Sequence, residues 1–408
     1  MRAPQRDLKA SRALARRAAL AALLAVAACS KDKNVDEPAK LTPLPHPSVH
    51  VTHLWGHSMG DKKAAVLRLG QGISIADNRV FAAAHKGEVV ALDLTNGRVI
   101  WHAKTKAPLS GGTAASSALV VAGASDGQLF ALDSATGHTR WNVRLNGEVL
   151  APAAITERLI AVRTVDGKLH ALSPEDGHEL WATEQQVPRL SLRGTASPVI
   201  SGDLVLCGFD NGKVVAVSAA DGSVQWEATV TPPHGRTELE RLDDIDSPVR
   251  VADRDVYAVG FQGKVAMLAI DTGQVWWSHD DSSYRGLILD EDTLYLADAD
   301  GVVTALKART GAAVWQQKAL LHRGLSPIAV MDDAVLAGDF QGYLHFLDKA
   351  SGALAARVSA GGGRISTQPL VVGDVVVVVN DHGQINAFRV KPRGAADSKR
   401  KAAPAQIQ

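Results

Sequence analysis

The sequence predicts an all-β fold, namely an eight-bladed β-propeller of four-stranded antiparallel blades whose last blade is closed by the N-terminal strand. The first observation is an internal repeat: phrases such as GEVVALDLTNGRVIW and GQLFALDSATGHTRW recur at intervals of 38 to 51 residues, which is the sequence signature of repeat folds. The eight copies begin at Gly87, Gly127, Gly167, Gly212, Gly263, Gly301, Gly342 and Gly383.

The second observation is the pattern inside each copy. In the first seven copies a second glycine follows ten positions after the first, and in six of them a tryptophan follows four positions later, whereas the seventh has Ala356 there. The first glycine usually follows Asp or Asn, which predicts a two-residue hairpin loop with positive φ angles. The run after it, such as residues 89–92, is apolar and predicts a strand covered on both faces. About four short strands in roughly 40 residues are typical of a propeller blade.

The third observation concerns ring closure. The eighth copy runs into a polar tail without a second glycine or tryptophan, whereas the segment VTHLWGH before the first blade contains the unmatched Trp55. A blade buries its faces only against its neighbours, so we expect residues 51–57 to supply the outer strand of the last blade. The predicted propeller spans residues 49–390, and residues 391–408 are predicted to be a disordered basic tail.

The N-terminal 48 residues read as export and anchoring signals. Residues 1–28 have a basic start followed by an apolar run of eleven residues, 18–28, which predicts a signal peptide too short to span a bilayer. The end of this run, Val26-Ala27-Ala28-Cys29, resembles the lipobox of bacterial lipoproteins, which implies that Cys29 is acylated. Ser30 after the cysteine implies sorting to the outer membrane. Residues 29–48, polar and Pro-rich, are predicted to be a flexible tether.

The remaining chemistry-bearing residues favour structural roles. A formal net charge of +1 gives no indication of nucleic-acid binding. Cys207 lies in an apolar strand, so we expect it to be buried and inert. The sequence contains no catalytic or phosphate-binding motif, and we predict no cofactor and no metal. The best candidates for metal ligands are the clustered histidines His46, His50, His53 and His57, but side chains alternate across a strand, so neighbouring ones would point in opposite directions. The aspartates that recur at one repeat position, Asp93, Asp133 and Asp348, indicate a turn-stabilising role.

Two links between copies of the repeat are longer than the others, and these are the candidate functional segments. From the repeat tryptophan (or Ala356) to the first glycine of the next copy, the offset is 24 to 27 positions, except in two consecutive links where it is 31 and 37. These two links should emerge side by side on one face. Two interpretations stay open: tolerated loops joined by an internal Arg–Asp salt bridge, or a docking patch. In the docking patch, leucines act as anchors, an arginine acts as a fork-shaped donor, and acids orient that arginine or meet a basic partner. The candidate partner-binding residues are Leu190, Leu192 and Arg193 in the first link and Asp244 and Asp246 in the second.

The lipobox, the Pro-rich tether, the A-x-D-x-x-x-G-x-x-x-W phrase and the link sequences SLRG and ERLDDID together resemble the BamB family of outer-membrane lipoproteins. The resemblance implies a non-enzymatic subunit of the β-barrel assembly machinery on the periplasmic face of the outer membrane. It implies binding to the POTRA domains of BamA through the five link residues, contact with other subunits, and assistance to nascent barrel proteins. Two alternatives are a quinoprotein dehydrogenase with pyrroloquinoline quinone and calcium, which shares the blade phrase, and a lipoprotein scaffold for another partner.

Overall fold

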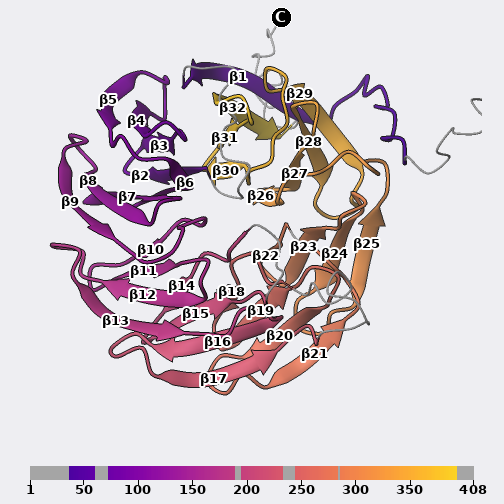
Figure 1. Ribbon diagram of the computed structural model, residues 1–408. Coiled ribbons are helices and arrows are strands. Elements are labelled where there is room, and N and C mark those ends of the chain that lie inside the picture. The colour runs from indigo at the N-terminus through magenta and orange to yellow at the C-terminus, as the bar shows by residue number, and fades with distance from the viewer. Residues whose placement is uncertain (1–35, 60–71, 189–193, 233–243, 284, 393–408) are drawn as a thin grey trace, which may run out of the picture. The chain divides into compact units, whose positions relative to one another are not determined.

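The computed structural model describes residues 36–59, 72–188, 194–232, 244–283 and 285–392. All of the described strands lie in one compact unit, Ala39–Gln408, and residues 36–38 belong to a separate unit. These described parts contain no helix that is long and apolar enough to cross a membrane. The strands form eight four-stranded antiparallel sheets, the blades, which follow one another around a ring (Figure 1). In each of blades 1 to 7, numbered in chain order, the strand that comes first in the sequence is the innermost.

The first four blades follow the sequence order without exception. Their strands, blade by blade, are β2 (Ile73–Ala76), β3 (Arg79–Ala83), β4 (Glu88–Asp93) and β5 (Val99–Lys104); β6 (Leu109–Ala115), β7 (Leu119–Ala124), β8 (Gln128–Asp133) and β9 (Thr139–Arg144); β10 (Ala154–Ile155), β11 (Ile160–Arg163), β12 (Lys168–Leu172) and β13 (Glu179–Glu184); and β14 (Val199–Ser201), β15 (Leu204–Gly208), β16 (Lys213–Ser218) and β17 (Val224–Thr229).

Blades 5 to 7 repeat this order, and blade 8 combines both ends of the unit. Their strands are β18 (Arg250–Ala252), β19 (Asp255–Val259), β20 (Val265–Ala269) and β21 (Val275–His279); β22 (Leu287–Asp290), β23 (Thr293–Ala297), β24 (Val303–Lys307) and β25 (Ala313–Gln317); β26 (Ala329–Met331), β27 (Ala334–Gly338), β28 (Tyr343–Asp348) and β29 (Leu354–Ser359); and β30 (Leu370–Val372), β31 (Val375–Val379), β32 (Gln384–Pro392) and β1 (Val49–Ser58).

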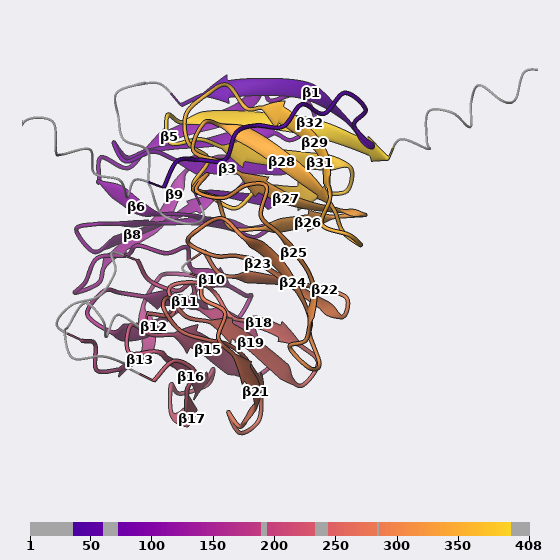
Figure 2. The same cartoon turned by 90° about the vertical axis from the view of Figure 1, so that its right-hand side faces the viewer.

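Ring closure by the N-terminal strand is confirmed. β1 pairs antiparallel with β32 from Val49–Pro392 to Ser58–Gln384, with one register shift between His53 and Trp55. The two strands lie side by side in both views (Figures 1 and 2). β1 is therefore the outermost strand of blade 8, and the ring has no open sheet at its seam.

The core is divided into eight apolar clusters, each formed between two neighbouring blades. β4 shows why its sequence is apolar without alternation. Val90 and Leu92 pack toward blade 8, whereas Val89 and Ala91 pack toward blade 2. A strand covered on both faces needs apolar residues at every position, because each buried side chain of this size contributes about 1.5–3 kcal/mol.

The hairpin loops at the first glycine differ from the predicted two-residue loops. β7 ends at Ala124 and β8 begins at Gln128, so three residues form the loop. Only Gly127 has a positive φ, at 82°, and its amide donates to the carbonyl of Ala124 at 3.2 Å. This is the pattern of a turn followed by one left-handed residue, in which the preceding Asp126 keeps an ordinary conformation.

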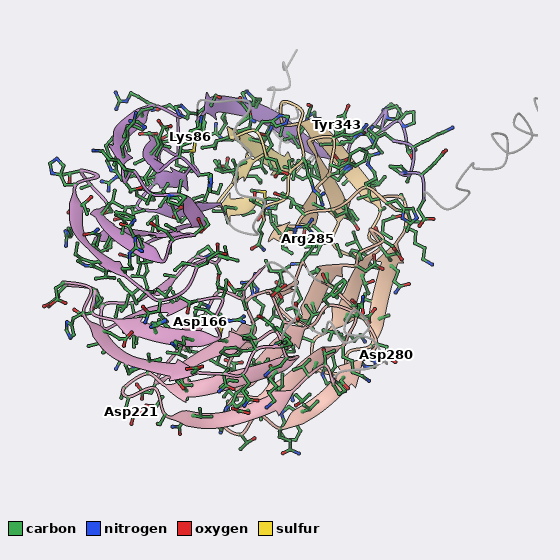
Figure 3. The ribbon with its side chains drawn as sticks, viewed as in Figure 1. Lys86, Asp166, Asp221, Asp280, Arg285 and Tyr343 are labelled. Atoms are coloured by element: carbon green, nitrogen blue, oxygen red, sulfur yellow. The ribbon has the colours of Figure 1, made fainter. Side chains whose placement is uncertain are left out.

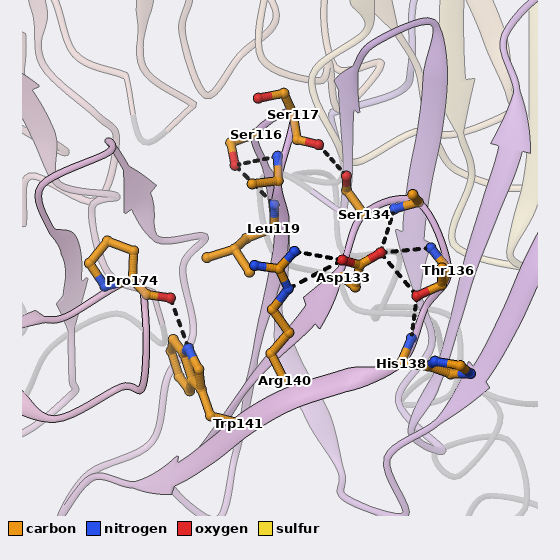
Figure 4. Close-up of polar contacts among 12 residues, drawn as sticks. Ser116, Ser117, Leu119, Asp133, Ser134, Thr136, His138, Arg140, Trp141 and Pro174 are labelled. Carbon is orange, nitrogen blue, oxygen red and sulfur yellow. Dashed lines mark hydrogen bonds and ion pairs between the residues drawn. The ribbon is translucent and has the colours of Figure 1, made fainter.

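The aspartates of the outer turns stabilise them, as their recurrence predicts. Asp221 precedes the glycine of the β16–β17 turn on the outer rim (Figure 3), and its carboxylate accepts hydrogen bonds from the amide and hydroxyl of Ser223 at 3.0 and 2.7 Å. Asp133 accepts hydrogen bonds from Thr136 and a forked pair from Arg140 (Figure 4). The hydrogen bonds from Arg140 and then Thr136 lower the pKa of Asp133 to about 2.

The repeat tryptophans fasten each blade to the next. Trp141 packs against Gly177 of the following blade and donates from Nε1 to the carbonyl of Pro174 at 3.0 Å (Figure 4). We call this combination of an indole–glycine contact and an Nε1–carbonyl hydrogen bond a clasp. In the seven clasps of the described residues the Nε1–O distances lie between 2.6 and 3.1 Å. The indole–glycine pairs are Trp55–Gly97, Trp101–Gly137, Trp141–Gly177, Trp181–Gly222, Trp226–Gly273, Trp277–Gly311 and Trp315–Gly352.

The missing seventh tryptophan has a topological reason. Ala356 lies in β29 and faces blade 8, where the outer strand β1 comes from the other end of the chain. Blade 8 therefore has no hairpin turn between its third and fourth strands, and no turn glycine or carbonyl for an indole to contact. Ala356 is instead buried in the apolar cluster between blades 7 and 8.

Candidate docking surface

The structure describes the two long links in part. Leu190, Leu192 and Arg193 lie outside the described residues, as does the segment 233–243 of the second link and the anchor residue Cys29. Asp244 and Asp246 lie between β17 and β18, just before blade 5. The site is therefore built from the described ends of both links and from the strands beneath them.

The described ends of the two links lie against each other. Gly194, at which the described part of the first link resumes, is so close to Asp246 that a β-carbon on Gly194 would lie 3.1 Å from the carboxyl carbon. Neighbouring links of a propeller were expected to emerge side by side, and these two ends do so. A larger residue than glycine at position 194 would displace the carboxylate.

The second link is rooted in the protein interior. Ile245 is fully buried, and its amide donates to the carbonyl of Phe209 in blade 4 at 3.2 Å. The carbonyl of Asp244 accepts from the amide of Phe261 in blade 5 at 2.9 Å. The side chain of Asp244 is 1% exposed, and that of Asp246 is half-buried. The two acids thus belong to the base of the link.

A buried arginine lies beneath this base. Arg163, at the end of β11, is 1% exposed and forms an ion pair with Asp210 of blade 4. Its Nη1 donates to the carbonyl of Gly208 at 2.8 Å, and its guanidinium lies 4.5 Å from the ring centre of Phe209. Phe209 is the residue that holds Ile245, so Arg163 joins blade 3, blade 4 and the second link.

The surroundings of Asp246 disfavour the charged form of its carboxyl group. Burial, reinforced by the charges of Asp244 and Asp210, raises the pKa of Asp246 to about 8, while the charge of Arg163 opposes the rise. Oδ1 of Asp246 is buried and has no hydrogen-bond partner among the residues that the structure describes. These surroundings favour the protonated form of Asp246, and a cation placed beside it would favour release of that proton.

Sequence reasoning missed Arg163, although the repeat contains a signal for it. The position four residues before the first glycine is Ala83, Gly123, Gly208, Val259, Ala297, Gly338 or Val379 in the other copies. Arg163 is the one charged residue at this position of the repeat. A charge at a position where every other copy has a small or apolar residue indicates a buried ion pair or a functional site.

Other candidate chemistry has ordinary structural explanations. Cys207 is fully buried, as predicted, and burial raises the pKa of its thiol to about 12. His53 in β1 lies 3.1 Å from Oδ1 of Asn386 in β32. Among the described residues there is no group of three or more His, Cys, Asp or Glu side chains arranged to hold a metal ion.

A model of the family described as "Outer membrane protein assembly factor BamB" matches residues 52–108, 85–317 and 299–392. The protein of that name from Pseudomonas aeruginosa is 43% identical over 375 residues, which cover 92% of this chain and 98% of the relative. The one from Bordetella pertussis is 34% identical over 374 residues, covering 91% of this chain and 95% of the relative.

Solved structures agree with the sequence relatives. The crystal structure of BamB from Moraxella catarrhalis has a TM-score of 0.76 at 26% identity and covers 83% of this chain and 100% of its own. Quinohemoprotein alcohol dehydrogenase from Comamonas testosteroni has a TM-score of 0.67 at 13% identity over 83% of this chain and 76% of its own, which shows the fold alone. The match over nearly the whole chain confirms the resemblance first seen in the blade phrase and the links, and the chain belongs to the BamB family of outer-membrane protein assembly factors.

Proposed function

We propose that this chain is a non-enzymatic lipoprotein subunit of the outer-membrane β-barrel assembly machinery, and that it binds the POTRA domains of BamA through its two long links. Membership in a family of assembly factors supports the general role. The proposal gives no residue a catalytic role and needs no cofactor. It places the chain at the periplasmic face of the outer membrane, held by lipid on Cys29.

One observation carries the docking surface: the base of the second link lies against the C-terminal part of the first link, at Asp246 and Gly194. A protein surface that binds well requires side chains held in place before the partner arrives, because immobilising them on binding costs affinity. The buried Ile245 and the Arg163–Asp210 pair supply a rigid base. Leu190, Leu192 and Arg193 are the proposed apolar anchors and donor. Asp246 is the proposed acid that orients Arg193, because a carboxyl oxygen can accept a hydrogen bond from a guanidinium with or without its own proton.

The binding experiment is a titration of the purified full chain with the POTRA domains of BamA. Arg193→Ala should raise Kd by about 30-fold, the effect of losing about 2 kcal/mol at an interface hot spot. Leu190→Ala and Leu192→Ala should weaken binding in the same direction. Arg158→Ala is the matched control, because Arg158 belongs to the same blade and its side chain is 71% exposed.

Two outcomes would contradict the docking surface. If the wild-type chain does not bind the POTRA domains, the proposed partner is wrong. If the wild type binds but the three link variants bind equally well, the partner stands and the links are not the contact surface. Circular dichroism of each variant should be unchanged, because surface substitutions rarely cost more than about 0.5 kcal/mol.

The lipid anchor is tested separately by mass spectrometry of the mature N-terminus. The wild-type chain should begin at Cys29 and carry acyl chains, whereas Cys29→Ser should remain unprocessed and take up no labelled fatty acid. An unacylated wild-type N-terminus would contradict the anchor without affecting the docking surface.

A further inference from the structure

The ten residues before β1 are bound to the propeller. This segment, residues 39–48, which we call the strap, was predicted to be part of a flexible tether. Its first residue, Ala39, donates from its amide to the carbonyl of Leu321 at 2.9 Å, and its last, Ser48, donates to the carbonyl of Ala355 in β29 at 3.0 Å. Both views show the segment that enters β1 running beside blade 7 (Figures 1 and 2). The strap is thus fastened at its two ends.

A rigid, buried guanidinium holds the start of the strap. Arg323 is 3% exposed, and its Nε and Nη2 donate to Oδ2 of Asp339 at 2.8 and 2.6 Å. Asp339 is fully buried and also contacts Nε2 of His345 at 2.8 Å. With its orientation fixed by this carboxylate, Arg323 donates from Nη1 to the carbonyl of Ala39 at 2.9 Å. A donor that is already ordered loses little entropy when it binds the chain.

A second arginine holds the middle of the strap. Arg357 in β29 donates from Nη2 to the carbonyl of Thr42 at 3.1 Å, and its guanidinium lies 5.6 Å from the ring centre of Tyr343 in β28. Tyr343 is labelled in blade 7 in Figure 3. The strap also contains three prolines at alternate positions, in the run PLPHP. Proline limits the unfolded conformations of a segment, so ordering it against the blade costs less entropy.

The position of the strap on the ring determines where it lies relative to the proposed docking surface. Leu321 and Arg323 lie in the link from β25 of blade 6 to β26 of blade 7, and Ala355 lies in the outer strand of blade 7. In a closed ring of eight blades, blade 7 lies opposite blade 3. The first long link leaves blade 3, so the strap begins across the ring from the proposed docking surface.

We propose that blade 7 and the link before it form an intramolecular docking site for the strap. The docked strap fixes the point beside blade 7 at which the membrane anchor leaves the propeller, and it holds the proposed docking surface for the partner on the far side of the ring. This inference rests on the proposed acylation of Cys29. From Cys29 to Ala39 the chain can span at most about 36 Å, against about 72 Å if it were free as far as Val49. The strap therefore halves the reach of the anchor and determines which blade lies nearest the bilayer.

Amide hydrogen exchange of the full chain tests the docked strap without any membrane. The amides of Ala39 and Ser48 should exchange more slowly than in a free peptide of residues 39–48. Arg357→Ala removes the hydrogen bond to the carbonyl of Thr42 and should speed exchange at Ala39 and Ser48 by about tenfold, because the strap opens as one unit and a hydrogen bond to a charged group contributes roughly that factor. Arg389→Ala is the matched control, because the guanidinium of Arg389 pairs with Asp374 in blade 8 instead. Wild-type amides exchanging as fast as the peptide would overturn the proposal.

Energy transfer on vesicles tests the orientation. A donor dye is attached to Ala350→Cys or to Glu175→Cys, which are equivalent outer-turn positions in blades 7 and 3. The acylated full chain is bound to phosphatidylethanolamine–phosphatidylglycerol vesicles whose surface carries acceptor dyes. Cys207 is buried with a thiol pKa of about 12 and should remain unlabelled. Transfer should be more efficient from position 350 than from position 175. Replacing residues 39–48 with a Gly-Ser segment of equal length should abolish that difference.

The two tests separate this inference from the lipid anchor. A wild-type chain that does not bind the vesicles contradicts acylation of Cys29, while protected amides at Ala39 and Ser48 still support the strap. A chain that binds the vesicles but transfers energy equally from both positions, or is unaffected by replacement of the strap, overturns the orientation by the strap and leaves the anchor standing.

Discussion

Trp55 and Gly97 close the propeller. The indole of Trp55, in the first strand of the chain, packs on Gly97 in the outer turn of blade 1, and its Nε1 donates to the carbonyl of Leu94 at 2.8 Å. A β-carbon on Gly97 would lie 2.5 Å from the indole. Blade 8 is thus fastened to blade 1 by the same indole–glycine contact that joins the other blades.

Gly97→Ala should lower the free energy of unfolding by about 2–4 kcal/mol, because the new methyl group clashes with the indole and a φ of 71° disfavours alanine. Gly373→Ala is the control, since its φ is also positive, at 55°, but no atom lies within 4 Å. Denaturant unfolding measures both. Equal losses for the two variants would show that the backbone conformation, and not the clasp, accounts for the effect.

Removing residues 49–60 should lower the melting temperature of the entire propeller. The deletion takes away β1 and Trp55, exposes the edge of β32 and opens the apolar cluster between blades 8 and 1. Removing residues 393–408 provides the comparison, and we expect no change. Calorimetry showing an unchanged melting temperature in the first deletion would mean that β1 adds nothing to ring closure.

The repeat made the fold predictable from sequence. Glycines and tryptophans at fixed offsets gave the blade count, and the unmatched Trp55 indicated how the ring closes. The partner of each tryptophan was not predictable, because the offset of Trp101 from the first glycine says nothing about contact with Gly137 in another blade. Once that contact is known, the alanine at position 356 follows from the absence of a turn in blade 8.

The candidate site was predictable only as a departure from the repeat. Link length identified the two adjacent links, and their described ends do meet at Gly194 and Asp246. The burial of Asp244 could not be predicted, because a run of acidic residues between β-strands is typical of an exposed loop. The repeat marks Arg163 as the one charged residue at its position, but it does not identify the partner, because the ion pair with Asp210 joins two different blades.

Arg163→Met should cost about 3–5 kcal/mol of stability, because it leaves Asp210 as an uncompensated buried charge. Adding Asp210→Leu should restore much of the loss, since replacing both members of a buried pair by apolar residues is often neutral. Urea unfolding of the two single variants and the double variant gives the coupling energy. Additive losses would contradict a pair whose members depend on each other.

Asp246→Asn should change how stability depends on pH. An ordinary Asp has a pKa near 3.9, and in the folded chain burial and the charges of Asp244 and Asp210 raise the pKa of Asp246 to about 8. Between these two pH values the folded state binds a proton that the unfolded state has released. Stability therefore falls as the pH rises through this window, by at most about 1.4 kcal/mol per pH unit from this one group, and levels off above about pH 8.

Asparagine has no proton to lose, so the variant should lack this part of the decline and gain stability relative to the wild type between pH 5 and pH 8. Urea unfolding at intervals across that range measures the difference. Asp203→Asn serves as the comparison, because the side chain of Asp203 is 93% exposed and its replacement should leave the slope unchanged. Parallel pH profiles for the wild type and Asp246→Asn would mean that Asp246 is ionised in the folded chain. A cation, such as the guanidinium of Arg193, would then have to lie beside it, because burial of an unpaired carboxylate is too costly.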